Sequence, residues 1–553
     1  MKRILYLILG VILVISSCSI NQSGSGYLTI KTPEIINPPL KSVIYNDTQI
    51  DPLKNQSFLR YVLLIETKDG KRIKTEYLKT NEEKVIDVPA GIPLNFFVGV
   101  YIAESTDSFT EKFNTFVLSD VKENVILMEG ETKLIEFNLD LTKSTKVKSY
   151  YGSQFTGPLG TTLYSVLNLC IDDNTGNPYF TILPLSPKIL VERTIVLTYD
   201  GSSFNSFPLP PALTNDYIKI VKVENSVDNR YWVVSSNKIY RVANINFDSI
   251  GSAVSNTDVQ ISSDLFGKDY LKKAKKIISL YFPKQGAEPR DRYYYFIDYG
   301  MGFLGFNWGL DSDSWSSVED VKMDFTLNKV RQYSLLLDMK QDIGTRNTFV
   351  ITKLGAFYAR EIGLAAFSQG DYIKGINSFK KIINISEEKN GNPILITKVM
   401  PTSKRVYIGT RKGLYYIDKS NSYWIDFVNS NENNMVLLDS KALNKIEDVN
   451  EEIIDNMFLL NINDMDVLVV GTPKKIMFKN MNNGKKDYLT LNDGLLFVPI
   501  GRLLNIVATN EVDFISHTIA PVVDIIVDNN NNLIWIGTRF GLSSISVNQL
   551  NIW

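Results

Sequence analysis

The feature that most constrains the fold of this 553-residue chain is a phrase that occurs twice. The sequence IGTRKGL ends at Leu414, and IGTRFGL ends at Leu542. Each copy stands between apolar, strand-like runs, so that strand, tight turn and strand follow one another. Self-similarity with a period of tens of residues indicates an array or a ring of repeated units.

Weaker copies extend the repeat upstream. They keep the order of strand, turn, strand, turn and strand, although the second turn is not always a glycine. That turn falls near Pro187, Lys238, Gly302, Gly355, Gly413, Lys475 and Gly541. The spacing is about 50 to 66 residues, and seven units fill residues 162–553.

One such unit is a small antiparallel meander that cannot bury its faces alone. Stacked around an axis, the units cover one another and keep only short edges, so the repeat predicts a seven-bladed β-propeller. We expect Gly413 and Gly541 to supply positive φ in equivalent turns. Trp535, Tyr407 and Val469 are predicted to pack between blades.

The repeated threonines are predicted to have a structural role. Their hydroxyl groups would tie the end of one strand to the turn that follows it. The residues concerned are Thr352, Thr410, Thr472 and Thr538.

These octapeptides, WIGTRFGL and YIGTRKGL, resemble the repeat of the sensory propellers of bacterial two-component regulators, whose consensus is roughly W-I-G-T-x-x-G-L. The resemblance implies a propeller. Those sensors continue into a transmembrane helix and a kinase, whereas this chain ends at Trp553. We therefore expect no signalling kinase in this chain.

Residues 27–141 have a different pattern. About seven short runs alternate apolar and polar residues with period two, and turn residues separate them. Asp69–Gly70 is the dipeptide that a two-residue type I′ hairpin turn favours. The pattern predicts a β-sandwich of immunoglobulin-like or transthyretin-like kind. Residues 142–161, charged and then glycine-rich, are interpreted as a linker to the propeller.

The first 18 residues, MKRILYLILGVILVISSC, combine a basic start, an apolar stretch and small residues before Cys18. Twelve apolar residues span about 18 Å as a helix, too short for a bilayer core of roughly 30 Å. Residues 1–17 resemble a bacterial lipoprotein signal peptide, which implies lipid attachment at Cys18. An ordinary secretory signal is the alternative. Residues 18–26 are a polar tether.

Composition narrows the chemistry. The chain has 59 basic and 60 acidic residues, for a net charge of −1, so no overall field favours nucleic acid. Its only other cysteine, Cys170, lies in an apolar run and is expected to be buried. His517 is the single histidine, and we expect it to be structural. No metal site, cofactor site or catalytic residue is predicted.

Two functional hypotheses remain open. The first is an envelope lipoprotein, lipid-anchored to a membrane and facing the periplasm or the exterior, whose propeller binds a protein or glycan without enzymatic activity. The second is a carbohydrate-active propeller enzyme with carboxylates converging at the central channel. Carboxylates that are neighbours in sequence, such as Asp172 and Asp173, make poor catalytic pairs.

Two segments carry helical spacing of their apolar residues. Residues 263–280 and 440–458 are predicted to be amphipathic helices over a propeller face.

Overall fold

The computed structural model of the chain separates into two units, residues 1–145 with 499–517 and residues 146–498 with 518–553. The residues that the structure describes are 25–31, 43–45, 48–50, 59–78, 82–103, 113–137, 146–150, 164–184, 194–209, 218–222, 231–234, 238–242, 259–260, 276–282, 292–298, 303–308, 315–320, 322–327, 330–342, 345, 347–352, 355–359, 379–383, 395–430, 438–450, 452–496 and 518–553.

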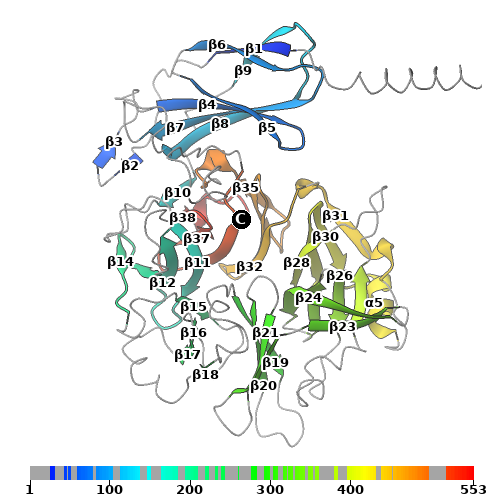
Figure 1. The fold of residues 1–553 in the computed structure, drawn as a ribbon. Coiled ribbons are helices and arrows are strands. Elements are labelled where there is room, and N and C mark those ends of the chain that lie inside the picture. The colour runs from blue at the N-terminus through cyan, green and yellow to red at the C-terminus, as the bar shows by residue number, and fades with distance from the viewer. Residues whose placement is uncertain are drawn as a thin grey trace, which may run out of the picture. The chain divides into compact units, whose positions relative to one another are not determined.

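The first unit contains two facing sheets (Figure 1). The larger has the order β5 (Arg72–Leu78), β4 (Leu59–Thr67), β7 (Leu94–Ala103) and β8 (Phe113–Val125). The smaller has the order β6 (Glu83–Pro89), β1 (Ser25–Lys31) and β9 (Thr132–Glu136), with β1 and β9 parallel. A hairpin pairs β2 (Val43–Tyr45) with β3 (Thr48–Ile50).

Alternation along the strands builds the core of this unit. In β6, Ile86 and Val88 are buried, while Val85, which precedes them and lies on the opposite face of the strand, is 60% exposed. One hydrophobic cluster joins such residues with Leu63 of β4 and Phe96 of β7, so the two sheets share a core. The predicted β-sandwich is confirmed. Its first strand begins at Ser25, two residues before the predicted start.

The predicted type I′ turn at Asp69–Gly70 is wrong in detail. Gly70 has a φ of 83°, but Asp69 has no positive φ, which a type I′ turn requires of both residues. The hairpin instead has a longer loop, closed by a bond from Thr67 N to Lys71 O at 2.9 Å.

The second unit contains seven sheets among its described residues. Blade 1 has β11 (Tyr164–Ile171), β12 (Pro178–Pro184), β13 (Ile195–Tyr199) and β14 (Phe204–Ser206). Blade 2 has β15 (Lys219–Lys222), β16 (Tyr231–Val234), β17 (Lys238–Val242) and β18 (Val259–Gln260). Blade 3 has β19 (Lys276–Phe282), β20 (Arg292–Asp298), β21 (Phe303–Trp308) and β22 (Trp315–Asp320).

Blade 4 has β23 (Lys322–Leu327), β24 (Val330–Gln341), β25 (Thr348–Thr352), β26 (Gly355–Ala359) and β27 (Phe379–Ile383). Blade 5 has β28 (Ile396–Pro401), β29 (Arg405–Thr410), β30 (Gly413–Asp418) and β31 (Leu443–Ile446). Blade 6 has β32 (Asn456–Ile462), β33 (Met465–Gly471), β34 (Ile476–Asn480) and β35 (Lys486–Leu489).

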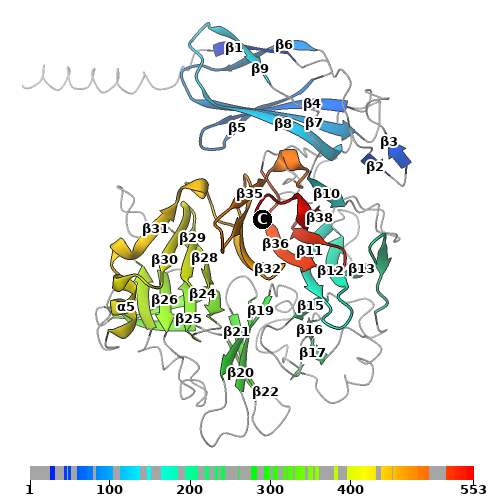
Figure 2. The ribbon, with the colours of Figure 1, turned by 180° about the vertical axis from the view of Figure 1, so that it is seen from behind.

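Blade 7 joins two distant parts of the chain. Its strands β36 (Val522–Asp528), β37 (Leu533–Thr538) and β38 (Gly541–Ser546) come from the C-terminal region, and its outer strand is β10 (Val147–Tyr150). Figure 2 shows β10 beside β38. Residues 147–150, predicted to be part of a linker, instead form a blade strand, and their pairing with β38 satisfies the free edge of that strand.

The inner strands bring the blades into contact. β28 packs against β24 and β32, β32 packs against β36, and β36 packs against β11 of blade 1. The first and last blades therefore meet, and the predicted all-β chain with a seven-bladed propeller is confirmed.

The described helical elements are short. They are α5 (Ser422–Asn429) and the 3-10 turns η6 (Ser440–Ala442), η7 (Glu447–Val449), η8 (Leu491–Asp493) and η9 (Val547–Gln549). The helix predicted over 440–458 is wrong, because β31 and β32 occupy part of it. β19 likewise replaces the last part of the helix predicted over 263–280, whose remainder lies outside the described residues. Sheet pairing overrides helical spacing in both.

Candidate functional site

The repeated phrase builds the same turn in several blades. Gly355, Gly413 and Gly541 have φ values of 135°, 116° and 144°, as the sequence predicted for the last two. Each pairs with the threonine three residues before it; for example, Thr410 pairs with Gly413. An L-residue in this region of φ is strained, so glycine is required there.

The threonine hydroxyl closes the turns that follow Thr410, Thr472 and Thr538, as predicted, whereas the side chain of Thr352 lies outside the described residues. Thr410 Oγ1 donates to Gly413 O at 2.8 Å and accepts from Lys412 N at 3.0 Å. Thr538 Oγ1 donates to Gly541 O at 2.9 Å and accepts from Phe540 N at 3.2 Å. These side chains therefore hold backbone and are not available as nucleophiles.

The first glycine of the phrase has a separate function that sequence reasoning missed. A Cβ atom at Gly537 would lie 2.6 Å from Val166 Cγ1 of blade 1, and one at Gly409 would lie 2.7 Å from Ile454 Cγ2. Both glycines let the next blade approach closely, through the inner strand β11 at Gly537 and through the loop before β32 at Gly409. The signal was present in the sequence, since both copies read Ile-Gly-Thr.

The predicted packing residues are buried. Trp535, Tyr407 and Val469 all have 0% exposure. The Trp535 ring lies 4.8 Å from Phe180 of blade 1, centroid to centroid, and its Nε1 donates to buried Asp528 Oδ2 at 3.1 Å. Blade 7 is thus tied to blade 1 by an aromatic core.

Polar side chains of the inner strands join blade 7 to blade 1, blade 4 to blade 5 and blade 6 to blade 7. Asp524 Oδ2 accepts from Leu169 N of blade 1 at 2.9 Å, and Asp338 Oδ2 accepts from Val399 N of blade 5 at 3.3 Å. Asn456 Nδ2 reaches Val522 O of blade 7 at 3.4 Å. The carboxylates expected at a catalytic channel are in these two cases hydrogen-bonded to backbone.

The loop 447–455, described except at position 451, crosses from blade 5 to blade 6. Its described acidic residues are Glu447, Asp448, Glu452 and Asp455. Glu452 accepts from Thr472 Oγ1 at 2.5 Å and pairs with Lys475 Nζ at 3.0 Å. Asp448 pairs with Lys486 and accepts from Tyr488 Oη at 2.9 Å. The loop is therefore anchored to blade 6 along its length.

Burial and hydrogen-bond partners shift the pKa values of Asp448 in this loop and of Tyr488, which contacts it. Burial works to raise the pKa of Asp448, but hydrogen bonds from Lys486 and Tyr488 hold it below its usual value. Burial and the neighbouring carboxylate of Asp448 raise the pKa of Tyr488 to about 12. Both groups keep their ordinary charge near neutral pH.

Asp455, at the inner end of the same loop, differs. Burial raises its pKa to about 6, although the cations Arg539 of blade 7 and Lys398 of blade 5 oppose the shift. Its backbone N donates to Gly471 O at 2.9 Å, which fixes the residue at the start of β32. Charged groups of the two flanking blades therefore influence this carboxyl.

Its surroundings define a surface that we name the turn face: the turns after Thr410, Thr472 and Thr538, with the loops that enter β28, β32 and β36. Backbone bonds join these parts, from Arg411 N to Leu395 O at 3.0 Å and from Arg539 N to Pro521 O at 3.2 Å.

The turn face carries both charged and apolar exposed side chains. Arg411, Lys474 and Arg539 are exposed on its three turns. Leu395 and Ile453, on the adjoining loops, are 39% and 43% exposed. Exposed cations beside apolar side chains on a rigid backbone can dock a partner.

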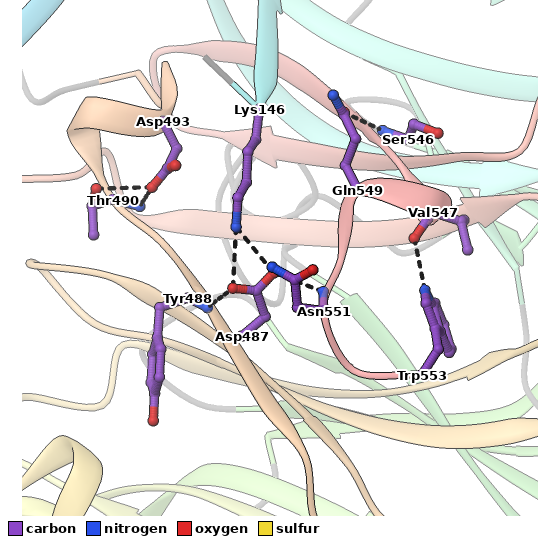
Figure 3. Close-up of polar contacts among 10 residues, drawn as sticks. All are labelled: Lys146, Asp487, Tyr488, Thr490, Asp493, Ser546, Val547, Gln549, Asn551 and Trp553. Atoms are coloured by element: carbon purple, nitrogen blue, oxygen red, sulfur yellow. Dashed lines mark hydrogen bonds and ion pairs between the residues drawn. The ribbon is translucent and has the colours of Figure 1, made fainter. Parts of the chain in front are cut away.

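A second polar cluster joins blade 6 to Lys146 and to the C-terminal segment (Figure 3). Buried Asp487 of β35 accepts from Lys146 Nζ at 3.1 Å and from Asn551 N at 2.9 Å. Asn480 Nδ2 also donates to Ile552 O at 3.0 Å. This carboxylate joins the first residue of the propeller unit to its C-terminal segment, so its function is structural.

The remaining predictions about individual residues have mixed outcomes. Cys170 is buried, with 2% exposure, as expected. Cys18 and His517 lie outside the described residues, so lipid attachment stays a prediction. In the part of the chain that the structure describes, no group of three His, Cys, Asp or Glu residues is arranged to hold a metal ion. No described helix has the length and hydropathy needed to cross a membrane.

Comparisons with known proteins identify similar folds only. No family model and no curated protein matches the chain. The extracellular domain of a hybrid two-component system protein of B. thetaiotaomicron is similar, with 13% identity and a TM-score of 0.39 over 73% of this chain and 40% of that one.

Two further solved structures are similar. PorZ, a surface component of the type-IX secretion system of Porphyromonas gingivalis, has 11% identity and a TM-score of 0.37 over 85% of this chain and 60% of that one. The Swd1 β-propeller domain of Myceliophteria thermophila has 8% identity and a TM-score of 0.35 over 69% and 97%. At these values the likenesses assign neither a family nor a function.

Proposed function

We propose that the chain is a lipid-anchored binding protein of the bacterial cell envelope. Residues 1–17 are removed, Cys18 carries the lipid, and the propeller binds an envelope protein or glycan through the turn face, without catalysis. The observation that carries this proposal is the set of exposed side chains on three consecutive turns, Arg411, Lys474 and Arg539. Backbone bonds to the adjoining loops hold this set in place before any partner arrives, which lowers the entropy lost on binding.

The environment of the inner-strand carboxylates also supports a binding function. Asp338 and Asp524 each accept a hydrogen bond from the backbone of the next blade. A carboxylate in such a bond is held by its donor and is a poor acid or base.

Asp455 favours the second hypothesis, a carbohydrate-active enzyme. A glycosidase needs one carboxyl group with a raised pKa as its general acid, and the pKa of Asp455 is raised to about 6. Under this hypothesis the purified chain hydrolyses a glycan, and Asp455→Asn abolishes turnover. Loss of hydrolysis in this variant, with unchanged folding, would assign the chain to the enzymes.

The anchor is tested by metabolic labelling with radioactive fatty acid. Wild type is expected to incorporate label, and Cys18→Ser is expected to incorporate none. Equal labelling of the two would end the proposal of a lipid anchor and leave the ordinary secretory signal.

The binding face is tested by crosslinking in the native envelope, with a glycan array and a panel of hydrolase substrates beside it. We expect Arg411→Glu with Arg539→Glu to lose the crosslinked partner or the bound glycan. Lys404→Glu is the matched control, because Lys404 is exposed on the β28–β29 turn, at the other end of the same strands. Equal loss in both variants would contradict binding through the turn face.

A further inference from the structure

Exposed apolar side chains are concentrated in the sandwich. Six of the eleven large hydrophobic residues that are exposed in the described chain belong to the first unit, although fewer of its residues are described. The two extremes are Met128, 67% exposed, and Val85, 60% exposed. Isolated exposed apolar residues need no explanation, but a concentration at one end of a domain does.

Three of the six lie at the start of β1. Met128 is 67% exposed, Ile126 is 48% exposed and Tyr27 is 43% exposed. We name these three residues the tip. Tyr27 is the third residue of β1, and its N donates to Glu131 O at 2.7 Å. Gly130 N donates to Ser25 O at 2.9 Å, so the segment 126–131 lies against the beginning of that strand.

The core holds the tip in its exposed arrangement. Leu127, between Ile126 and Met128, is fully buried in the sandwich core. A Cβ atom at Gly26 would lie 2.9 Å from Leu127 Cβ, so only glycine at that position admits the leucine so closely. With Leu127 fixed inward, its two neighbours in the extended segment point to solvent. Their exposure is thus built into the fold.

The length of chain before β1 limits what can lie next to the tip. Six residues separate Cys18 from Ser25. At no more than about 3.6 Å per residue, β1 begins within about 25 Å of the cysteine, however the chain runs. If Cys18 carries lipid, the tip is held within that distance of the bilayer surface.

We propose that the tip inserts into the surface of the bilayer that holds the Cys18 lipid, and so orients the sandwich on it. This rests on the lipid attachment proposed above. The transfer of methionine and isoleucine side chains from water into the interfacial region lowers the free energy, and tyrosine is enriched at that depth. Because one acyl anchor fixes distance but not orientation, a second apolar contact supplies the orientation that the anchor lacks.

The test uses the full lipidated chain in vesicles of phosphatidylethanolamine and phosphatidylglycerol. Met128→Cys and Ile126→Cys are each labelled with an environment-sensitive fluorophore. Cys170 is buried and Cys18 carries lipid, so labelling is selective. Val121→Cys is the matched control, since Val121 is 39% exposed on β8 of the other sheet.

We expect a blue shift of emission at positions 126 and 128, with quenching by lipids that carry a spin label on the acyl chain. The label at position 121 is expected to keep its aqueous emission. Flotation of the same samples reports the anchor separately. Chains that float while the labels at 126 and 128 remain aqueous would overturn the insertion and leave the anchor intact. Shielding seen in native envelopes but not in vesicles would also overturn it, in favour of a protein partner.

Discussion

Blades 5 and 7 close their central hairpin with a glycine, whereas blade 6 closes the equivalent hairpin with Lys475. In the first two, Gly413 and Gly541 take positive φ. Lys475 is not among the residues with positive φ, and Thr472 Oγ1 closes the turn by accepting from Lys475 N at 3.1 Å. The same strand pairing is therefore reached with two different turn conformations.

The lysine gives blade 6 contacts that a glycine cannot make. Its Nζ pairs with Glu452, donates to Asp448 O and lies 5.3 Å from the centre of the Tyr488 ring. It thereby holds the acidic loop 447–455, which ends at Asp455. Glycine is therefore required by one turn conformation and not by the blade fold itself. A copy without glycine has a side chain at this position, and that side chain can anchor a neighbouring loop.

The largest expected effect is that of Gly541→Ala. The new Cβ would sit at a φ of 144° and 2.7 Å from Leu496 Cδ1. Backbone strain and overpacking together predict a loss of about 3 kcal/mol in the free energy of unfolding. Urea unfolding measures it. Gly484→Ala is the control, since Gly484 has a φ of 76° but nothing within 4 Å, and only the strain of about 1 kcal/mol is expected.

Removal of the threonine hydroxyls is expected to cause the next largest loss of stability. Thr538→Val would leave Phe540 N and Gly541 O without their buried partner, which predicts a loss of about 2 kcal/mol. Thr472→Val should cost at least as much, because its hydroxyl also contacts Glu452 and Lys475 N. Thermal unfolding of both variants checks the order. A smaller loss for Thr472→Val would mean that blade 6 does not depend on this closure.

The architecture could be predicted from the sequence because local rules determine it. Period, turn glycines and closing threonines act within one unit of chain, so they can be recognised without the rest of the fold. The ring closure by β10 could not be predicted in this way, since its strand finds its partner about 400 residues away at β38. The contact between Gly537 and Val166 is non-local in the same sense.

The candidate site was less predictable than the fold. Asp455 stands in a segment whose apolar spacing suggested a helix, and its neighbours Lys398 and Arg539 come from two other blades. Only the ring brings these three charges together. The positions of Arg411 and Arg539 inside the repeated phrase were the available signal, because equivalent positions in adjacent blades must lie on one face.

Asp455→Asn tests the loop that Lys475 holds. The folded chain binds the proton of Asp455 more tightly than the unfolded chain does, because burial raises the pKa to about 6. The stability from this group is therefore complete below about pH 4 and is lost as the pH rises through 6. We expect the asparagine variant to be more stable than wild type by about 1–2 kcal/mol at pH 8, with no such difference at pH 4. Urea unfolding at a series of pH values measures this. A difference in stability between the two proteins that does not change with pH would contradict a raised pKa at Asp455.

The smallest effect, Lys475→Ala, separates the two kinds of turn. Because Lys475 lacks positive φ, alanine enters without backbone strain. The loss is limited to the ion pair with Glu452 and the contact with Tyr488, about 1 kcal/mol for partly exposed groups. Unfolding in low and high salt measures it, and high salt should reduce the difference. A loss as large as that of Gly541→Ala would show that the contacts of Lys475 contribute far more than partly exposed groups normally do.

A second measurement on the same variant concerns the loop rather than the turn. Without Lys475, the loop 447–455 keeps the backbone bonds of Ile454 N to Thr410 O and of Asp455 N to Gly471 O, both 2.9 Å. Its inner end should therefore stay protected from hydrogen exchange, while the stretch near Asp448 and Glu452 exchanges faster. Faster exchange at Asp455 too would mean that Lys475 holds the whole loop. Its removal would then also weaken binding at the turn face, which the crosslinking experiment can detect.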